Sequence, residues 1–235
     1  MPITISEKKI KSKIKLGETV AVVENIKYPH FENEEHKKLC SRMNSFYLSV
    51  AEKYSYFAHN KLVKKISLHK SRYKLPLTLS MNYTAAFCGE SIVSVVLDLT
   101  FTEGKNIKTR RFSQMWSVEK KDMLSASEIL RTDRKSIRKI HSIVFSIADK
   151  NAENSAFGYF EDYSKKLSKN FDVNCCFAVP NGLCFFVNAG ILSPIKYGAN
   201  SFVLPFDVIS DVAKGEFLPK NGQKEPQNTD IVNNV

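Results

Sequence analysis

Glycine is scarce in this sequence, with 9 residues among 235, and the usual phosphate-binding glycine motifs are missing. Neither G-x-x-x-x-G-K-S/T nor G-x-G-x-x-G occurs, which argues against the nucleotide chemistry that depends on such loops. The hydrolase motif G-x-S-x-G and the metalloprotease motif H-E-x-x-H are also missing. We therefore expect a protein that is not an enzyme, and an enzyme of unrecognised class stays open as an alternative.

Cysteine is also sparse, and its spacing suits neither a disulfide framework nor a metal site. The five cysteines form an odd set with no C-x-x-C pair: Cys40, Cys88, Cys175, Cys176 and Cys184. Neighbouring residues of a strand point to opposite faces, so the vicinal pair Cys175-Cys176 cannot act as a zinc knuckle or a thioredoxin-type site. We expect free thiols and assign no metal and no cofactor.

Long hydrophobic runs are missing as well. The longest apolar stretches, residues 91–101 and 175–187, contain turn or polar residues and fall short of the roughly 20 apolar residues of a membrane-spanning helix. The N-terminal segment MPITISEKKIKSKIKLGE has lysines but no apolar core and no small-residue cleavage site. We expect no membrane span and a cytoplasmic location.

Acidic residues are too few to balance the basic ones. The chain has 35 Lys and Arg against 24 Asp and Glu, which gives a formal net charge of +11. This charge favours anionic partners such as nucleic acid, acidic glycans or membrane surfaces, without naming one. With 43% hydrophobic residues the chain can bury a sizeable core. We predict one domain over 1–218 and a polar, disordered tail over 219–235.

A long helix followed by strands dominates the expected secondary structure. Between 33 and 60, apolar residues recur every three or four positions, as in a helix buried along one stripe: Leu39, Met43, Phe46, Val50, Tyr54 and Phe57. Segments rich in β-branched and aromatic residues predict strands, with turn residues between several of them, at 18–28, 75–87, 91–101, 108–118 and 201–205.

The second half of the chain adds helices and a hairpin. Thr132-Asp133 can cap a helix that reaches about residue 151, and further helices are expected at 157–170 and 207–214. Asn181-Gly182 between two apolar runs is a strong hairpin signal. Strands grouped in blocks predict an α+β fold, with an antiparallel sheet packed against the long N-terminal helix and two or three further helices.

One stripe of basic residues is the densest candidate site. These residues fall along one side of the expected helix after Asp133, opposite its apolar side: Arg131, Arg134, Lys135, Arg138 and Lys139. Such a stripe can hold the phosphates or carboxylates of an anionic polymer. It is also typical of a solvated helix face, and no recognised nucleic-acid motif accompanies it.

Two further residues are weaker candidates for acid–base chemistry. Asp98 is embedded in an apolar strand, where burial could raise its pKa, but its phase places it beside Ser94 and Thr100 on the more polar face. His141 lies on an apolar helical stripe, where a histidine that serves packing is the commoner case.

Three segments share their order and spacing with a known domain. The first reads YPHF at 28–31 and precedes the long helix with Asn44; the second reads KDMLSASEIL at 121–130. The third starts with NGLCFFV at 181–187 and, after Ser193-Pro194 and Gly198, ends with FVLP at 202–205. Together they resemble a bacterial domain of unknown function that occurs in RsiV-type anti-sigma factors and beside some peptidoglycan deacetylases.

This resemblance covers residues 20–212 and implies an α+β domain that binds something outside its own chain, as the anti-sigma relatives bind lysozyme. The family's Gly-Gly-Ala-His segment has no counterpart, since residues 104–111 read GKNIKTRR. The resemblance therefore assigns no binding residue in this sequence. We expect a non-enzymatic binding or sensing module with a protein or glycan ligand. A binder of anionic polymers, nucleic acid or acidic glycan, through the basic helix face is the alternative.

Overall fold

The structure is a computed structural model that describes residues 2–214. The chain divides into two compact units. Of the described residues, unit 1 comprises 2–83 and 97–110, and unit 2 comprises 84–96 and 111–214. The single domain expected over 1–218 stays a prediction, and the expected tail, 219–235, lies outside the described residues.

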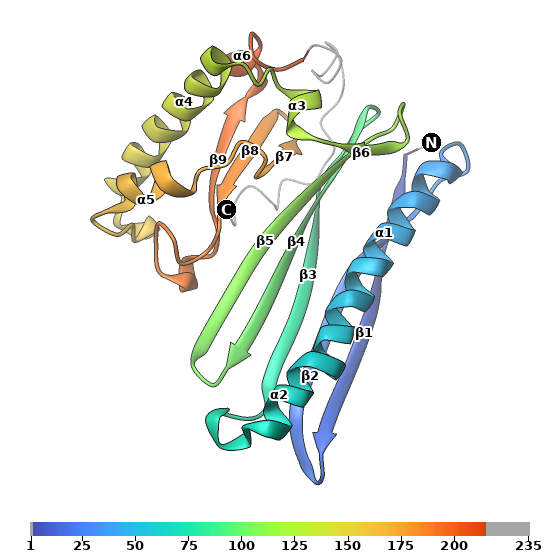
Figure 1. The fold of residues 1–235 in the computed structure, drawn as a ribbon. Helices are drawn as coiled ribbons and strands as arrows, with labels where there is room; N and C mark the ends of the chain where they lie inside the picture. Colours follow the sequence, from blue (N-terminus) through green and yellow to red (C-terminus); the bar gives the residue numbers. More distant parts are fainter. Residues whose placement is uncertain (1, 215–235) are drawn as a thin grey trace. The chain divides into compact units, whose positions relative to one another are not determined.

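Six strands pair in the order in which they follow one another along the chain (Figure 1). They are β1 (Thr4–Leu16), β2 (Thr19–Glu32), β3 (Leu77–Cys88), β4 (Ile92–Glu103), β5 (Asn106–Ser117) and β6 (Asp122–Leu124). β1 and β2 are antiparallel, whereas β2 and β3 are parallel. The α+β class is confirmed, but the sheet is mixed and not purely antiparallel. The reason is the helical crossover between β2 and β3, which brings the chain back to run in the same direction.

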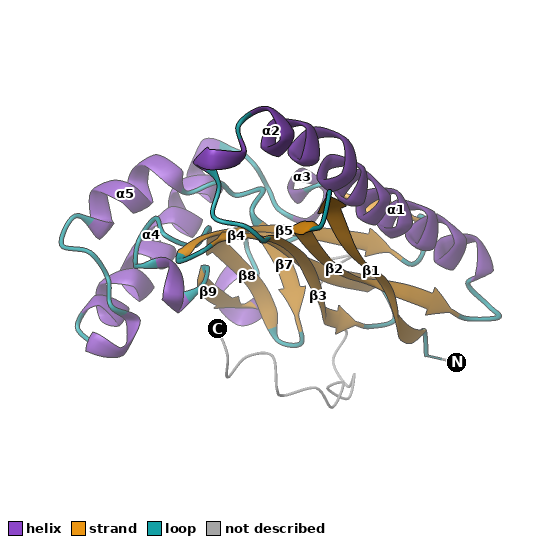
Figure 2. Ribbon diagram, turned by 90° about the horizontal axis from the view of Figure 1, so that it is seen from below, coloured by secondary structure: helices purple, strands orange, loops and turns teal. Residues whose placement is uncertain are grey.

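Unit 1 packs a long helical segment against one face of its strands (Figure 2). The segment runs through α1 (Lys37–Tyr56), the π-helical η1 (Phe57–Leu62) and α2 (Val63–Leu68), and the short 3₁₀ helix η2 (Lys70–Arg72) follows. Ala58, Leu62 and Ile66 of the helices meet Val22 and Leu79 of the strands in a buried cluster. The predicted long helix is confirmed, and it continues beyond residue 60 to Leu68.

Unit 2 contains a second, three-stranded antiparallel sheet with helices around it. Its elements are α3 (Ala126–Ile129), α4 (Arg134–Ala152), η3 (Ser155–Phe157), α5 (Tyr163–Asn170), β7 (Cys176–Val179), β8 (Gly182–Val187), η4 (Ile195–Tyr197), β9 (Asn200–Pro205) and α6 (Phe206–Ile209). Val144 and Ala148 of α4 pack with Leu183, Phe185 and Phe202 in a buried core. All five residues are fully buried, with 0% of their surface exposed. This core therefore holds α4 against the sheet.

Two local predictions for unit 2 are confirmed. The carboxylate of Asp133 accepts hydrogen bonds from the backbone N–H groups of Lys135 and Ser136, both at 3.0 Å, and so caps α4. The predicted hairpin joins β7 to β8, with Pro180-Asn181 as its turn and Gly182, the first residue of β8, opposite Val179. A Cβ at Gly182 would lie 2.2 Å from the carbonyl oxygen of Leu204, so this position requires glycine.

The N-terminal strand was not predicted. β1 covers the segment in which lysines alternate with other residues, and lysine is depleted in strands, so the sequence gives a weak strand signal there. Among the described residues, no helix is both long and apolar enough to cross a membrane.

Candidate functional site

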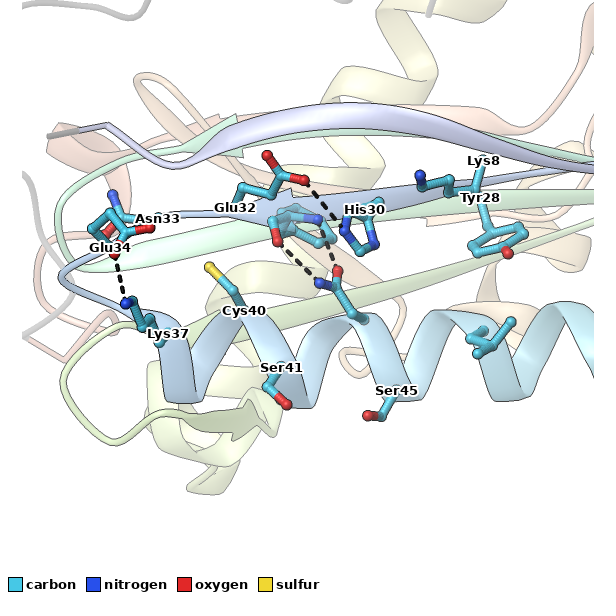
Figure 3. A pocket seen from close by; sticks show the side chains of 13 residues that line it. Lys8, Tyr28, His30, Glu32, Asn33, Glu34, Lys37, Cys40, Ser41 and Ser45 are labelled. Atoms are coloured by element: carbon cyan, nitrogen blue, oxygen red, sulfur yellow. Dashed lines mark hydrogen bonds and ion pairs between the residues drawn. The ribbon is translucent and has the colours of Figure 1, made fainter.

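A groove of about 530 Å³ opens in unit 1 between α1 and the β1–β2 hairpin (Figure 3). One wall is formed by Lys8 of β1 and by Tyr28, His30 and Glu32, which alternate along β2. The other wall is formed by one side of α1, where residues three or four positions apart are neighbours: Lys37, Cys40, Ser41, Asn44, Ser45 and Leu48. The groove is therefore built from secondary-structure elements, apart from Asn33 and Glu34 at one end.

Asn44 fixes the floor of the groove. Its Nδ2 donates a hydrogen bond to the carbonyl oxygen of Phe31 at 2.9 Å, and the N–H of Phe31 donates to its Oδ1 at 2.8 Å. The side-chain amide of Asn44 thus bonds to both the N–H and the C=O of Phe31, as the backbone of a neighbouring strand would. The ring of Phe31 is 1% exposed and packs 5.7 Å from that of Tyr47. The two walls are thus held together by both polar and apolar contacts.

The groove offers mixed chemistry at its surface. Lys37 pairs with Glu34 at 2.6 Å, and His30 lies 3.5 Å from Glu32. The Lys37–Glu34 pair is exposed, and in the other pair Glu32 is exposed while His30 is half-buried. Pairs this close to solvent contribute little stability and can rearrange around a ligand. Leu48 adds an apolar contact, since it is 40% exposed.

Cys40 is the one thiol that lines this groove. The residue is 4% exposed, and burial raises the pKa of its thiol. A thiol with a raised pKa stays protonated near neutral pH, and only the thiolate is a good nucleophile or metal ligand. Cys40 therefore acts as a small buried apolar side chain.

A buried carboxylate lies on the helix-facing side of unit 1. Glu24 of β2 is 2% exposed, and its Oε2 accepts a hydrogen bond from the hydroxyl of Ser12 at 2.8 Å. Nε2 of His59, in the π-helical η1, lies 3.4 Å from the same oxygen. The other oxygen, Oε1, has no hydrogen-bond partner among the described residues. The cluster joins β1, β2 and η1, and nothing else about it indicates chemistry.

The predicted basic stripe lies on α4 and just before it, in unit 2. Arg131, Arg134, Lys135 and Arg138 are exposed. Lys139 is half-buried and pairs with Asp211 at 2.5 Å, and that contact lowers the pKa of Asp211. The carboxylate of Asp133 lies at the start of the same helix. Two acidic groups therefore offset part of the positive charge of this stripe.

The two acid–base candidates lie in different units. Asp98 is a half-buried residue of β4 in unit 1. His141 belongs to unit 2, where its ring lies 4.3 Å from that of Phe145 and edge-on to Phe171 at 5.7 Å. These contacts support the interpretation of His141 as a packing residue at the border of the core. It also borders a shallow hollow with Glu161 and Asp162, and a hydrogen bond from Lys166 lowers the pKa of Asp162.

Metal-binding clusters are missing from the described part of the chain. Over residues 2–214, no group of three His, Cys, Asp or Glu side chains lies close enough to hold a metal ion. All five cysteines are free in the structure.

The groove was not predicted from the sequence. The segment YPHF at 28–31 and Asn44 were singled out through the family resemblance, and Cys40 as one of the five thiols, but none of them for lining a groove. The alternation of Tyr28, His30 and Glu32 at the end of a strand was a possible signal. This alternation could not predict the groove, because the opposite wall is formed by α1, and the position of α1 relative to β2 cannot be inferred from the sequence.

Comparisons with known proteins give a fold and no family. No family model matches the sequence, and no curated protein matches it. The fold is similar to a crystal structure of a DUF3298 family member from Bacteroides fragilis, with a TM-score of 0.61 and 11% identity over 91% of this chain and 94% of that one. It is also similar to a DUF3298 family protein from Pseudomonas aeruginosa, with a TM-score of 0.57 and 10% identity over 92% of this chain and 98% of that one. These likenesses show the fold alone, and the RsiV-like relationship stays a prediction.

Proposed function

We propose that this chain is a non-enzymatic binding module whose ligand site is the groove of unit 1, and that the ligand is a short extended segment of a partner protein. The observation that carries the proposal is the groove itself, whose two walls are joined by the paired hydrogen bonds between Asn44 and Phe31. A preformed site of this kind avoids part of the ordering cost of binding.

The lining of the groove suits a peptide better than a compact organic ligand. Hydroxyl groups of Ser41 and Ser45 and the carboxylate of Glu32 are exposed or near the surface and can bond to peptide N–H and C=O groups. Leu48 can take up one apolar side chain of the ligand. Small-molecule sites are mostly deep and apolar, whereas this groove is shallow and rimmed by charges.

A library of displayed linear peptides, selected on the intact protein, tests the proposal. Peptides that are enriched should lose affinity by about tenfold or more for Ser45→Trp, because the indole fills the groove. Glu52→Trp is the control, since Glu52, like Ser45, is an exposed residue of α1 but does not line the groove. The proposal fails if no peptide is enriched, or if enriched peptides bind both variants equally well.

The alternative, an anionic-polymer binder that uses the helix face of α4, is supported by the four exposed basic residues there. The opposing charges of Asp133 and Asp211 weigh against it. An enzyme of unrecognised class stays a second alternative, since His141 borders the hollow that Glu161 and Asp162 also line. The packing of the His141 ring against Phe145 and Phe171 weighs against it.

A further inference from the structure

Lysines gather on one face of the β1–β2 hairpin, and the register of the strands places them there. Ser12 bonds to the buried Glu24, and Ile14 and Leu16 pack against the cluster beneath the helices. Even-numbered residues of this part of β1 therefore face the helices. Successive side chains of a strand alternate between faces, so the odd-numbered positions face away from them: Lys9, Lys11, Lys13 and Lys15.

The register irregularity near Lys15 does not interrupt this pattern. Ile14 is opposite Val22 and Lys15 is opposite Val20, so the extra residue, Ala21, belongs to β2. The alternation of β1 continues unbroken to its end. All four odd-numbered lysines therefore share one face.

Neighbouring strands extend this surface with polar groups. Lys27 is opposite Lys9, and Asn25 is opposite Lys11. In the parallel pair, Ser80 of β3 is the partner of Asn25. We call this set the lysine face, and it consists of Lys9, Lys11, Lys13, Lys15, Asn25, Lys27 and Ser80.

The charge of the lysine face is largely uncompensated. Glu7 contacts Lys9 at 2.6 Å and Lys27 at 3.6 Å. Lys11, Lys13 and Lys15 are exposed, and among residues 2–214 no carboxylate lies within ion-pair distance of them. Like charges close together on a sheet are destabilising. A bound polyanion would remove this repulsion.

Protection of the sheet edge explains only part of the pattern. β1 is the first strand of the sheet, and lysines on an edge strand discourage pairing with other chains. Lys27, however, lies on β2, which is not the edge strand, since it pairs with β1 along its length and with β3 over Val22–Ile26. Edge protection also does not require four lysines on the same face.

The spacing and chemistry of the face favour one kind of anion. Lysines two positions apart on a strand lie about 6.7 Å from one another, so Lys9 to Lys15 span about 20 Å in a straight line. This arrangement suits a linear polymer with repeated negative groups. Single-stranded nucleic acid is usually held by aromatic side chains that stack on its bases, and the lysine face contains none. The hydroxyl group of the half-buried Ser80 can instead bond to sugar hydroxyls, whereas the side-chain oxygen of Asn25 is buried.

We propose that the lysine face of unit 1 binds a linear acidic polysaccharide. This inference is independent of the peptide groove, which lies on the helix-facing side of the same hairpin. The site needs no cofactor, and its affinity should fall steeply as salt is added, because each lysine contact releases counterions.

Charge reversal at matched positions tests the proposal. The first variant is Lys11→Glu, Lys13→Glu and Lys15→Glu. The control is Arg134→Glu, Lys135→Glu and Arg138→Glu on α4. Each triple variant lowers the formal charge by six, from +11 to +5 (11 − 6 = 5). All six residues are exposed, so circular dichroism should show both variants folded.

Heparin is the probe, and calorimetry at several salt concentrations gives its affinity. We expect the β1 variant to bind at least about tenfold more weakly than the unchanged protein, with a shallower salt dependence, and the α4 variant to change little. Ser45→Trp should leave heparin binding unchanged, which separates this proposal from the peptide groove. A milder variant, Lys11→Gln, Lys13→Gln and Lys15→Gln, should show a smaller loss and substitutes for the first if that one fails to fold.

Three results would overturn the proposal. The first is an equal loss of heparin affinity in the β1 variant and the α4 variant, which would mean that net charge and not the lysine face controls binding. The second is affinity for a thymidine oligonucleotide or for phosphatidylserine vesicles that equals the affinity for heparin. The third is no binding of heparin at low salt.

Discussion

Unit 1 and unit 2 differ in how far the basic residues on their surfaces are paired with acidic ones. In unit 1, Lys11, Lys13 and Lys15 have no acidic partner among the described residues, and a preformed groove lies on the other side of the same hairpin. In unit 2, Asp133 and Asp211 offset part of the charge of the basic stripe on α4, since Asp211 pairs with Lys139 and Asp133 lies at the start of the same helix. Both surfaces that we propose as binding sites therefore lie in unit 1.

The largest expected effect concerns how independent the two units are. Phe31→Ala in unit 1 and Phe185→Ala in unit 2 each empty a buried site and should each cost about 3–5 kcal/mol. Strands β3, β4 and β5 contribute residues to both units. We therefore expect both variants to lower the midpoint of one shared transition in calorimetry. Two separate transitions, each sensitive to one variant, would refute the single-domain prediction.

A smaller effect is expected at the joint between α1 and β2. Asn44→Ala removes two hydrogen bonds and leaves the N–H and C=O of Phe31 without their partner. The cost should be about 1–3 kcal/mol, measured by urea unfolding. Ser45→Ala, at the exposed neighbouring position, is the control and should change stability little. If the two substitutions had equal effects, the joint would not depend on Asn44.

The smallest effect is expected at the cap of α4. Hydrogen bonds from Ser136 hold the pKa of the Asp133 carboxyl below its ordinary value. Asp133 therefore contributes stability above the ordinary carboxyl pKa and loses it as pH falls through the lowered value. Asp133→Ala should lower the melting temperature at pH 7, with a smaller difference at pH 2.

Asp133→Asn provides the control for that pH dependence. Asparagine is also a good cap but does not titrate. Its melting temperature should exceed that of Asp133→Ala at pH 7. If the difference between the unchanged protein and Asp133→Ala stayed constant from pH 7 to pH 2, the carboxylate would not be the titrating group.

Unit 2 was the easier of the two units to predict from sequence. The Asp133 cap and the Asn181-Gly182 turn are local signals that depend on a few neighbouring residues. The stripe of basic residues on α4 was also predicted, because helical spacing alone places its members on one side. Its pairing with Asp211 was not predicted, since 72 residues separate Lys139 from that carboxylate.

Unit 1 was harder to predict because its features depend on pairings between segments. β1 was missed since alternating lysines resemble a solvated segment more than a strand. The long helix was predicted from its apolar stripe, but the π-helical stretch Phe57–Leu62 has no such signal. The groove arises only when α1 packs beside β1 and β2, and the lysine face only when β1 pairs with β2 and β2 with β3. Neither surface could therefore be seen in the sequence.

Hydrogen–deuterium exchange of the intact protein, with and without heparin and with and without a selected groove peptide, tests most directly whether unit 1 is the binding unit. If unit 1 is the binding unit, both ligands slow exchange within unit 1. Heparin should act on Thr4–Leu16 and Thr19–Glu32, and the peptide also on Lys37–Tyr56. Slowed exchange confined to Arg134–Ala152 of unit 2 would contradict it.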